Sequence, residues 1–161
     1  EQVRAEEERV AQLERELEAL EALAALPNTQ VSARSFGLAP LRESRPYVFD
    51  DLVERYEVLM DVALEKRAFR VEDDSSKEVT AMAERLGALR AGPRDVVDIH
   101  IAALRNKNSQ SNPIKAEAYA EESRLIALEL MGELVSYYRN RSVYLVRPDQ
   151  TNTGGAGGRD G

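Results

Sequence analysis

The sequence predicts an all-α protein, in which a four-helix bundle-type domain follows a coiled-coil-like N-terminal helix. Hydrophobic residues make up 43 % and charged residues 32 % of the 161 residues, but aromatic residues only 6 %, a mixture typical of long helices. Apolar residues also recur at helical spacing through most of the chain. Strand-like patterns are nearly absent, and the best of them, Ser142–Val146, is short.

Residues 1–26 are expected to form one helix with a heptad repeat. Its apolar seam consists of Val10, Leu13, Leu17 and Leu20. About three heptads make a weak coiled coil, so this helix would pair stably only if the following domain also dimerises. The alternative is a linker helix that packs on its own domain.

Two segments are expected to connect or end the structured parts. Residues 27–46 contain Pro27, Pro40 and Pro46 and show no sustained period, which indicates a connector. Residues 147–161 are rich in glycine and are expected to form a disordered tail. Because the chain starts inside a helical pattern, we expect it to be a piece of a larger cytoplasmic protein.

Residues 47–146 are predicted to form the main domain, with four helices. The first spans about Tyr47–Arg70, and the second follows Ser75 and is terminated by Gly92 and Pro93. The third starts at Pro93 and ends in a polar loop at residues 106–111. The fourth runs from about Pro113 to Tyr144. The apolar faces of the first two helices consist of Phe49, Leu52, Val53, Tyr56, Leu59, Met60 and Ala63, and of Val79, Met82, Ala83, Leu86 and Leu89.

The third and fourth helices carry more apolar residues than one buried stripe needs. Surplus apolar surface usually marks a partner or self-association surface, and homodimerisation is its simplest use. The residues expected at this interface are Ile99, His100, Leu104, Leu125, Leu128, Met131, Val135 and Tyr138.

His100 is the single histidine of a chain that has no cysteine. It is therefore the one side chain whose ordinary pKa lies near neutrality. Most simply it is a packed or interface residue, while the alternatives are a phosphoacceptor in a histidine phosphorelay, and a general base or ligand. Because Ile99 and Ile101 flank His100, we expect its imidazole ring to be shielded from solvent. No catalytic signature, metal-ligand spacing or cofactor motif accompanies it, so no catalytic, cofactor or metal residues are predicted.

The charge of the chain limits its partners. The formal net charge is −7 and the isoelectric point about 4.9. Nucleic acids and anionic membranes both attract clustered basic residues, so neither is an expected partner. No apolar run reaches the length that crosses a bilayer, and we expect a cytoplasmic location.

Two segments of the main domain resemble a known family. They are Phe49–Tyr56, which reads FDDLVERY, and Pro93–His100, which reads PRDVVDIH. The order of the helices and the long last helix fit as well. Over residues 47–146 the chain resembles the KaiA/RsbU signalling domains, which are the C-terminal domain of the clock protein KaiA and the N-terminal domain of RsbU-type phosphatases.

The resemblance implies a four-helix unit that forms homodimers, binds another protein and carries no chemistry. Family members bind a KaiC-type ATPase or a switch protein related to kinases. We therefore expect a non-catalytic, dimeric signal-transduction module that binds and regulates a partner protein. The alternatives are a phosphorelay bundle that uses His100, and a purely structural coiled-coil dimerisation segment.

Overall fold

The computed structural model describes residues 2–25, 39–69 and 75–145. Over these residues the chain forms six α-helices and no strand, which confirms the all-α class. The helices are α1 (Gln2–Ala25), α3 (Leu41–Ser44), α4 (Pro46–Phe69), α5 (Ser75–Ala88), α6 (Pro93–Ser109) and α7 (Pro113–Leu145). Most of the predicted connector and the whole predicted tail, residues 147–161, lie outside the described residues.

Helix α4 begins and ends within one residue of its predicted bounds. Pro46 suits a first helical position because its missing N–H would have no partner there. The predicted apolar face is buried, and Tyr56 and Met60 in its middle are fully inaccessible to solvent. Periodicity therefore placed this helix and its buried face correctly.

Helix α5 ends in a way that the sequence did not indicate. The N–H of Arg90 donates to the carbonyl of Gly87, and the N–H of Ala91 donates to the carbonyl of Leu86. This pair of bonds is a Schellman motif, and it holds Arg90 at a φ of 59°. The prediction that Gly92 and Pro93 terminate α5 is wrong, because Gly92 instead precedes α6 as its N-cap.

Asp95 fixes the start of α6. One carboxylate oxygen accepts a hydrogen bond from the N–H of Gly92 at 2.8 Å, and the other accepts one from the N–H of Leu41 at 2.7 Å. The hydrogen bond from Gly92 caps the N-terminus of α6, and the hydrogen bond from Leu41 attaches α3 to α6.

The polar loop predicted at residues 106–111 is wrong for its first part, because α6 continues to Ser109. Two polar side chains of this last turn reach α4. The amide of Asn106 donates to Glu57 at 2.6 Å, and Nζ of Lys107 donates to Asp61 at 2.8 Å. Contacts with a neighbouring helix thus extend a helix that local propensity alone would end.

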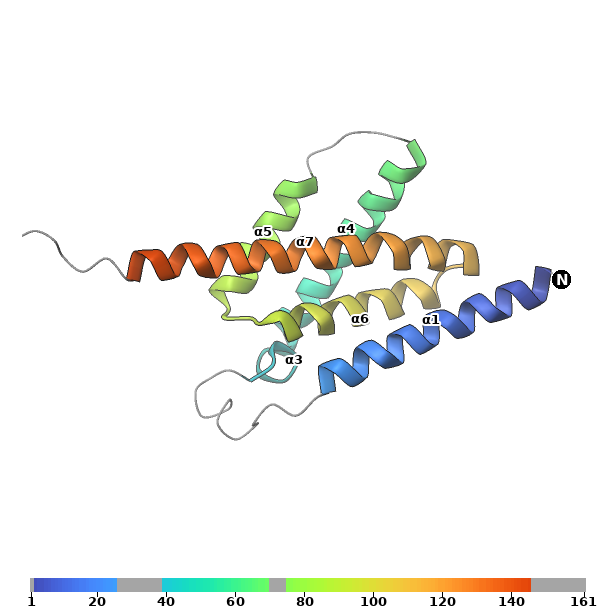
Figure 1. Ribbon diagram of the computed structural model, residues 1–161, viewed down its shortest axis with the longest axis horizontal. Helices are drawn as coiled ribbons and strands as arrows, with labels where there is room; N and C mark the ends of the chain where they lie inside the picture. Colours follow the sequence, from blue (N-terminus) through green and yellow to red (C-terminus); the bar gives the residue numbers. More distant parts are fainter. Residues whose placement is uncertain (1, 26–38, 70–74, 146–161) are drawn as a thin grey trace, which may run out of the picture.

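Helix α7 is the centre of the arrangement, since α1, α4, α5 and α6 all pack against it. In Figure 1, α6 runs beside α7, whereas α4 and α5 cross behind it at a steep angle. The crossing with α5 is close at Gly87, where a Cβ atom would lie 2.2 Å from the ring of Tyr137. Glycine at this position permits the approach of the two helices.

Helix α1 packs along α6 and α7 of its own chain. Leu17 is buried in the shared core, and Leu13 and Leu20 pack against that core. This is the arrangement that the sequence left open as the alternative to a coiled coil. Val10, the first residue of the predicted seam, remains 39 % exposed.

Candidate functional site

A small polar cluster lies inside the apolar core and contains His100. The hydroxyl of Tyr56 in α4 lies 3.0 Å from Nδ1 of His100 in α6 and 2.8 Å from the carbonyl oxygen of Ser123 in α7. All three residues are buried, with His100 only 4 % exposed. The two rings meet edge to face, with their centroids 5.9 Å apart. One phenol hydroxyl therefore joins three helices.

The hydrogen bonds of Tyr56 fix the form of the imidazole. A hydroxyl has one proton, and that proton is donated to the carbonyl of Ser123. The hydroxyl oxygen must then accept its second bond from an Nδ1–H of His100. Burial lowers the pKa of His100 to about 4, and burial also raises the pKa of Tyr56. Both side chains are consequently neutral at physiological pH.

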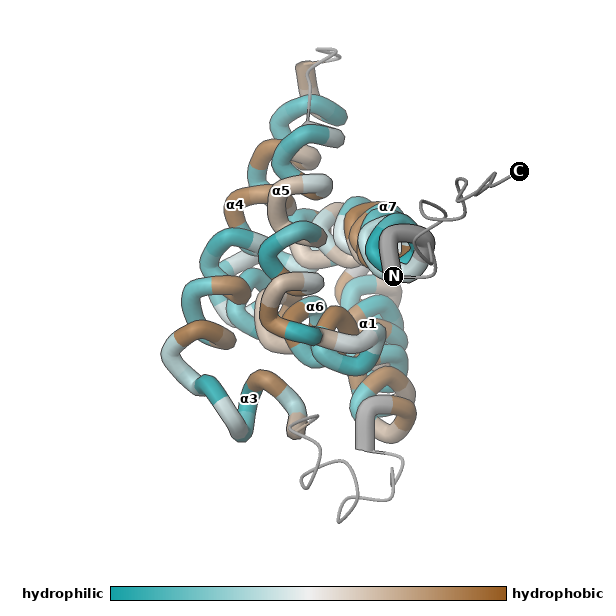
Figure 2. Tube along the Cα trace, turned by 90° about the vertical axis from the view of Figure 1, so that its left-hand side faces the viewer, coloured by the Kyte–Doolittle hydropathy of each residue, from teal (hydrophilic) through white to brown (hydrophobic). Residues whose placement is uncertain are grey.

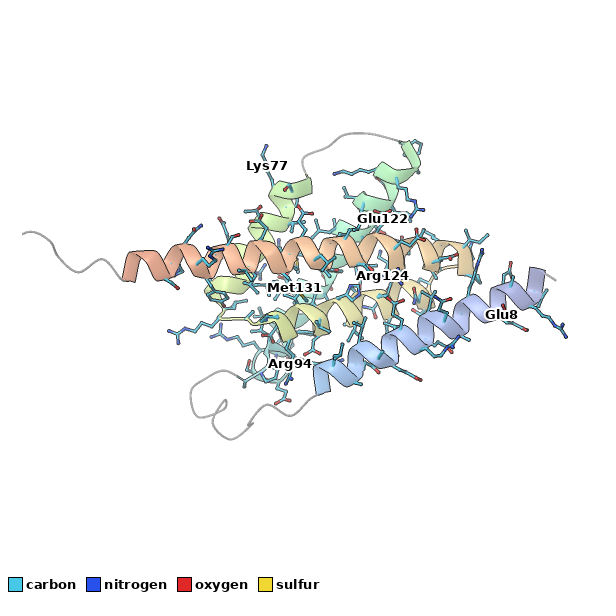
Figure 3. The ribbon with its side chains drawn as sticks, viewed as in Figure 1. Glu8, Lys77, Arg94, Glu122, Arg124 and Met131 are labelled. Atoms are coloured by element: carbon cyan, nitrogen blue, oxygen red, sulfur yellow. The ribbon has the colours of Figure 1, made fainter. Side chains whose placement is uncertain are left out.

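An ion pair between α1 and α7 lies close enough to His100 to influence its charge. The Nε of Arg124 donates to Glu16 at 2.6 Å, and its Nη2 donates to the second oxygen of the same carboxylate. Figure 3 shows Arg124 on the side of α7 that faces α6. Glu16 raises the pKa of His100 and Arg124 lowers it, so their effects oppose each other and burial dominates.

Ion pairs also line the edges of the contact between α1 and the rest of the chain. In addition to the pair of Glu16, Arg9 lies 3.5 Å from Glu117, and Glu21 lies 2.5 Å from Arg105. Side chains exposed to this extent contribute about 0–1 kcal/mol per pair. The apolar contacts of Leu13, Leu17 and Leu20 are therefore the main attachment of α1.

A cavity of about 340 Å³ opens between the middle of α1 and the adjoining ends of α6 and α7. Its lining includes Val10, Leu13 and Leu17 on one side, and Arg105 and Asn108 on the other.

A second feature is an uncovered apolar face on α7, which we call the outer face of α7. It consists of Ile114, Leu125, Leu128, Gly132 and Val135. The four side chains are 66 %, 64 %, 68 % and 53 % exposed. They lie opposite the buried side of α7, because α7 packs on the other helices through Ala116, Tyr119, Ala120, Ser123, Ile126, Leu130 and Leu134. Figure 2 views α7 end-on, at one edge of the molecule.

The structure divides the residues predicted at an interface into two groups. Ile99, His100 and Leu104 of α6 are buried within the chain's own core. The α7 residues Leu125, Leu128, Val135 and Tyr138 are exposed, and Met131 is half-buried against the core. Within one copy of the chain, only the α7 group is open to a partner.

Three residues of these sites were not singled out from the sequence as functional. Tyr56 appeared there only as one apolar position among several, and Ser123 carried no signal at all. Gly132 was visible as a helix-weakening residue, and its position between Leu128 and Val135 is the signal that could have marked it.

The described residues hold no group of three or more acidic, histidine or cysteine side chains placed to bind a metal ion. Among the same residues, no helix combines the length and the apolar character that crossing a membrane requires. Comparison with protein-family models, with curated proteins and with solved structures found no match for this chain.

Proposed function

We propose that this chain is a non-catalytic helical module of cytoplasmic signal transduction, which acts by protein–protein contact as a homodimer. The observation that carries the proposal is the outer face of α7. Apolar side chains that are exposed together on one helix face, as Leu125, Leu128 and Val135 are, are unfavourable in water and usually mark a contact surface. The resemblance of residues 47–146 to KaiA/RsbU-like domains agrees with this use, and it suggests that the dimer binds another signalling protein.

The phosphorelay alternative is less well supported by the geometry of His100. A phosphoacceptor nitrogen must be reached by a receiver domain, yet this ring is 4 % exposed and its Nδ1 is bonded to Tyr56. Incubation with a phosphodonor and a receiver domain should leave no acid-labile phosphate on the chain. Labelling that disappears in His100→Gln would establish the phosphorelay instead.

The structural coiled-coil alternative requires Leu13, Leu17 and Leu20 to pair with another helix. In one copy of the chain these residues already pack on the core. The same side chains cannot do both, so a coiled coil would require α1 to leave α6 and α7.

Light scattering over a range of concentrations tests the proposal. The unmodified chain should have the mass of a dimer, and Leu128→Glu should have the mass of a monomer with unchanged helicity. The matched control is Val58→Glu, which places the same charge at a 59 % exposed valine of α4 and should stay dimeric. A monomer at all concentrations would overturn the proposal, as would a dimer that Leu128→Glu leaves intact.

A further inference from the structure

Gly132 has no structural role among the residues of its own chain that the structure describes. It lies inside α7, where glycine is less favourable than alanine by about 1 kcal/mol. A Cβ atom at Gly132 would meet nothing within 4 Å. This contrasts with Gly87, where a Cβ would strike the ring of Tyr137. The chain thus carries a destabilising residue that no contact within the described structure requires.

The position of Gly132 indicates what it permits. Leu125, Leu128, Gly132, Val135 and Arg139 follow each other at intervals of three and four residues, which is the spacing of a helix–helix seam. The glycine lies at the centre of this series, and without a side chain it exposes the helix backbone at that point. Helix axes pack 8–10 Å apart depending on the side chains between them, and a glycine at the contact allows the shorter distance.

Nothing in the described structure covers this seam. In Figure 1, α7 passes in front of α4 and α5. Leu125, Leu128 and Val135 of its outer face are all more than half exposed. None of the described residues fills this role, so the occupant lies outside residues 2–25, 39–69 and 75–145 of the same copy.

The charges along the seam indicate the direction of a second α7 helix. Glu121, which also pairs with Arg67 of its own chain, lies one turn before Leu125, and Arg139 lies at the other end of the seam. In a parallel pair, Glu121 would face Glu121 of the second copy and Arg139 would face Arg139. Like charges repel, so this direction is unfavourable. In an antiparallel pair centred on Gly132, Arg139 lies beside Leu125 of the second copy, one turn from Glu121 of that copy. Arg139 is exposed and has no ion-pair partner among the residues that the structure describes.

We propose that two copies of this chain pair through antiparallel α7 helices, with Gly132 on the two-fold axis. A two-fold contact uses the same patch on both copies, so each glycine packs against the other and each arginine meets the acidic end of its partner. This inference rests on the proposed function and adds its geometry.

Single cysteines test the geometry directly, because the chain has no cysteine of its own. Leu125 and Arg139 each lie seven residues from Gly132 and face each other across an antiparallel pair. After mild oxidation, Leu125→Cys alone and Arg139→Cys alone should stay uncrosslinked. A mixture of these two variants should form a disulfide-linked heterodimer. Gly132→Cys should link to itself, while Val58→Cys on α4 is the control that should not link.

The outcomes separate the geometry from the proposed function. A disulfide between two copies of Leu125→Cys would indicate parallel helices and overturn the inference. A dimer by light scattering without any link between the Leu125 and Arg139 variants would also overturn it, and would leave the dimer itself standing. A monomer by light scattering would overturn both proposals. Circular dichroism of each variant verifies that α7 is still folded.

Discussion

Nδ1 of His100 and the hydroxyl of Tyr56 lie 3.0 Å apart, although the two residues are separated by 44 positions in the sequence. The contact joins α4 to α6 inside a core that otherwise consists almost entirely of apolar side chains. A buried polar pair of this kind is stable only while each group keeps its partner. The hydrogen bond of His100 therefore helps to fix how α4 packs on α6.

Replacing Tyr56 by phenylalanine should destabilise the chain by about 1–3 kcal/mol, because it leaves a buried polar group unpaired. The Nδ1–H of His100 loses its acceptor, while the carbonyl of Ser123 keeps its hydrogen bond within α7. Unfolding in urea measures the change. Tyr47→Phe is the matched control, since Tyr47 is on the same helix and 88 % exposed, and it should change the free energy of unfolding very little. Equal effects of the two substitutions would contradict a role for the buried hydroxyl.

Stability should fall as the pH decreases from 7 to 5. The folded chain holds the pKa of His100 at about 4, whereas its ordinary value is 6.5. Between these values the unfolded chain binds the proton and the folded chain does not, so the stabilisation is full above pH 6.5 and is lost on acidification. The loss between pH 7 and pH 5 should be about 2 kcal/mol.

Urea unfolding at several pH values measures this loss, and the ring resonances of the single histidine report its titration in the folded state. His100→Gln should show a much flatter profile above pH 5, where few other groups titrate. A profile that is equally steep in this variant would assign the effect to other groups.

The two helix-interior glycines, Gly87 and Gly132, should respond to alanine in opposite ways. Gly87→Ala should destabilise the chain by about 1–3 kcal/mol, because the new methyl group overlaps the ring of Tyr137. Gly132→Ala should stabilise the isolated chain by up to about 1 kcal/mol, because its Cβ enters open space. Thermal unfolding at low protein concentration compares the two. A loss of stability in both would mean that the surroundings of Gly132 are not open.

Arg90→Gly should stabilise the chain by about 1 kcal/mol. Arg90 occupies the left-handed region with a φ of 59°, where any side chain is strained and glycine is not. Arg90→Ala is the control, since it removes the same charge and keeps the strain. Denaturant titration of both variants should show a gain for glycine alone. The same gain in both would attribute the effect to the charge of the arginine.

The sequence predicted the elements better than their relationships. The faces of α4 and α5 followed from spacing, because each helix has one apolar side and strong local signals. The end of α6 was placed too early, since the contacts of Asn106 with Glu57 and of Lys107 with Asp61 come from another helix. No local signal at Arg90 indicated the turn that it forms.

For the same reason, the sequence anticipated only part of which residues are exposed. The sequence indicated more apolar residues on the last helix than its buried side needs. In the structure Leu125, Leu128 and Val135 are exposed. The spacing of apolar residues does not show which side of α6 other helices of the same chain cover. The burial of Ile99 and Leu104 is therefore seen only in the structure. The partnership of Tyr56 with His100 could not be read either, because it depends on how two helices meet.

Helix α7 contacts four other helices, yet it is the last of the described helices in the chain. A ribosome delivers residues in sequence order, so α1, α4, α5 and α6 emerge before the helix against which they pack. Until residues 113–145 have left the exit tunnel, the apolar faces of α1, α4, α5 and α6 are covered only in part, because each of them also packs on α7. Folding of the described helices is therefore completed after synthesis of α7, and truncation within α7 removes a packing surface that four other helices share.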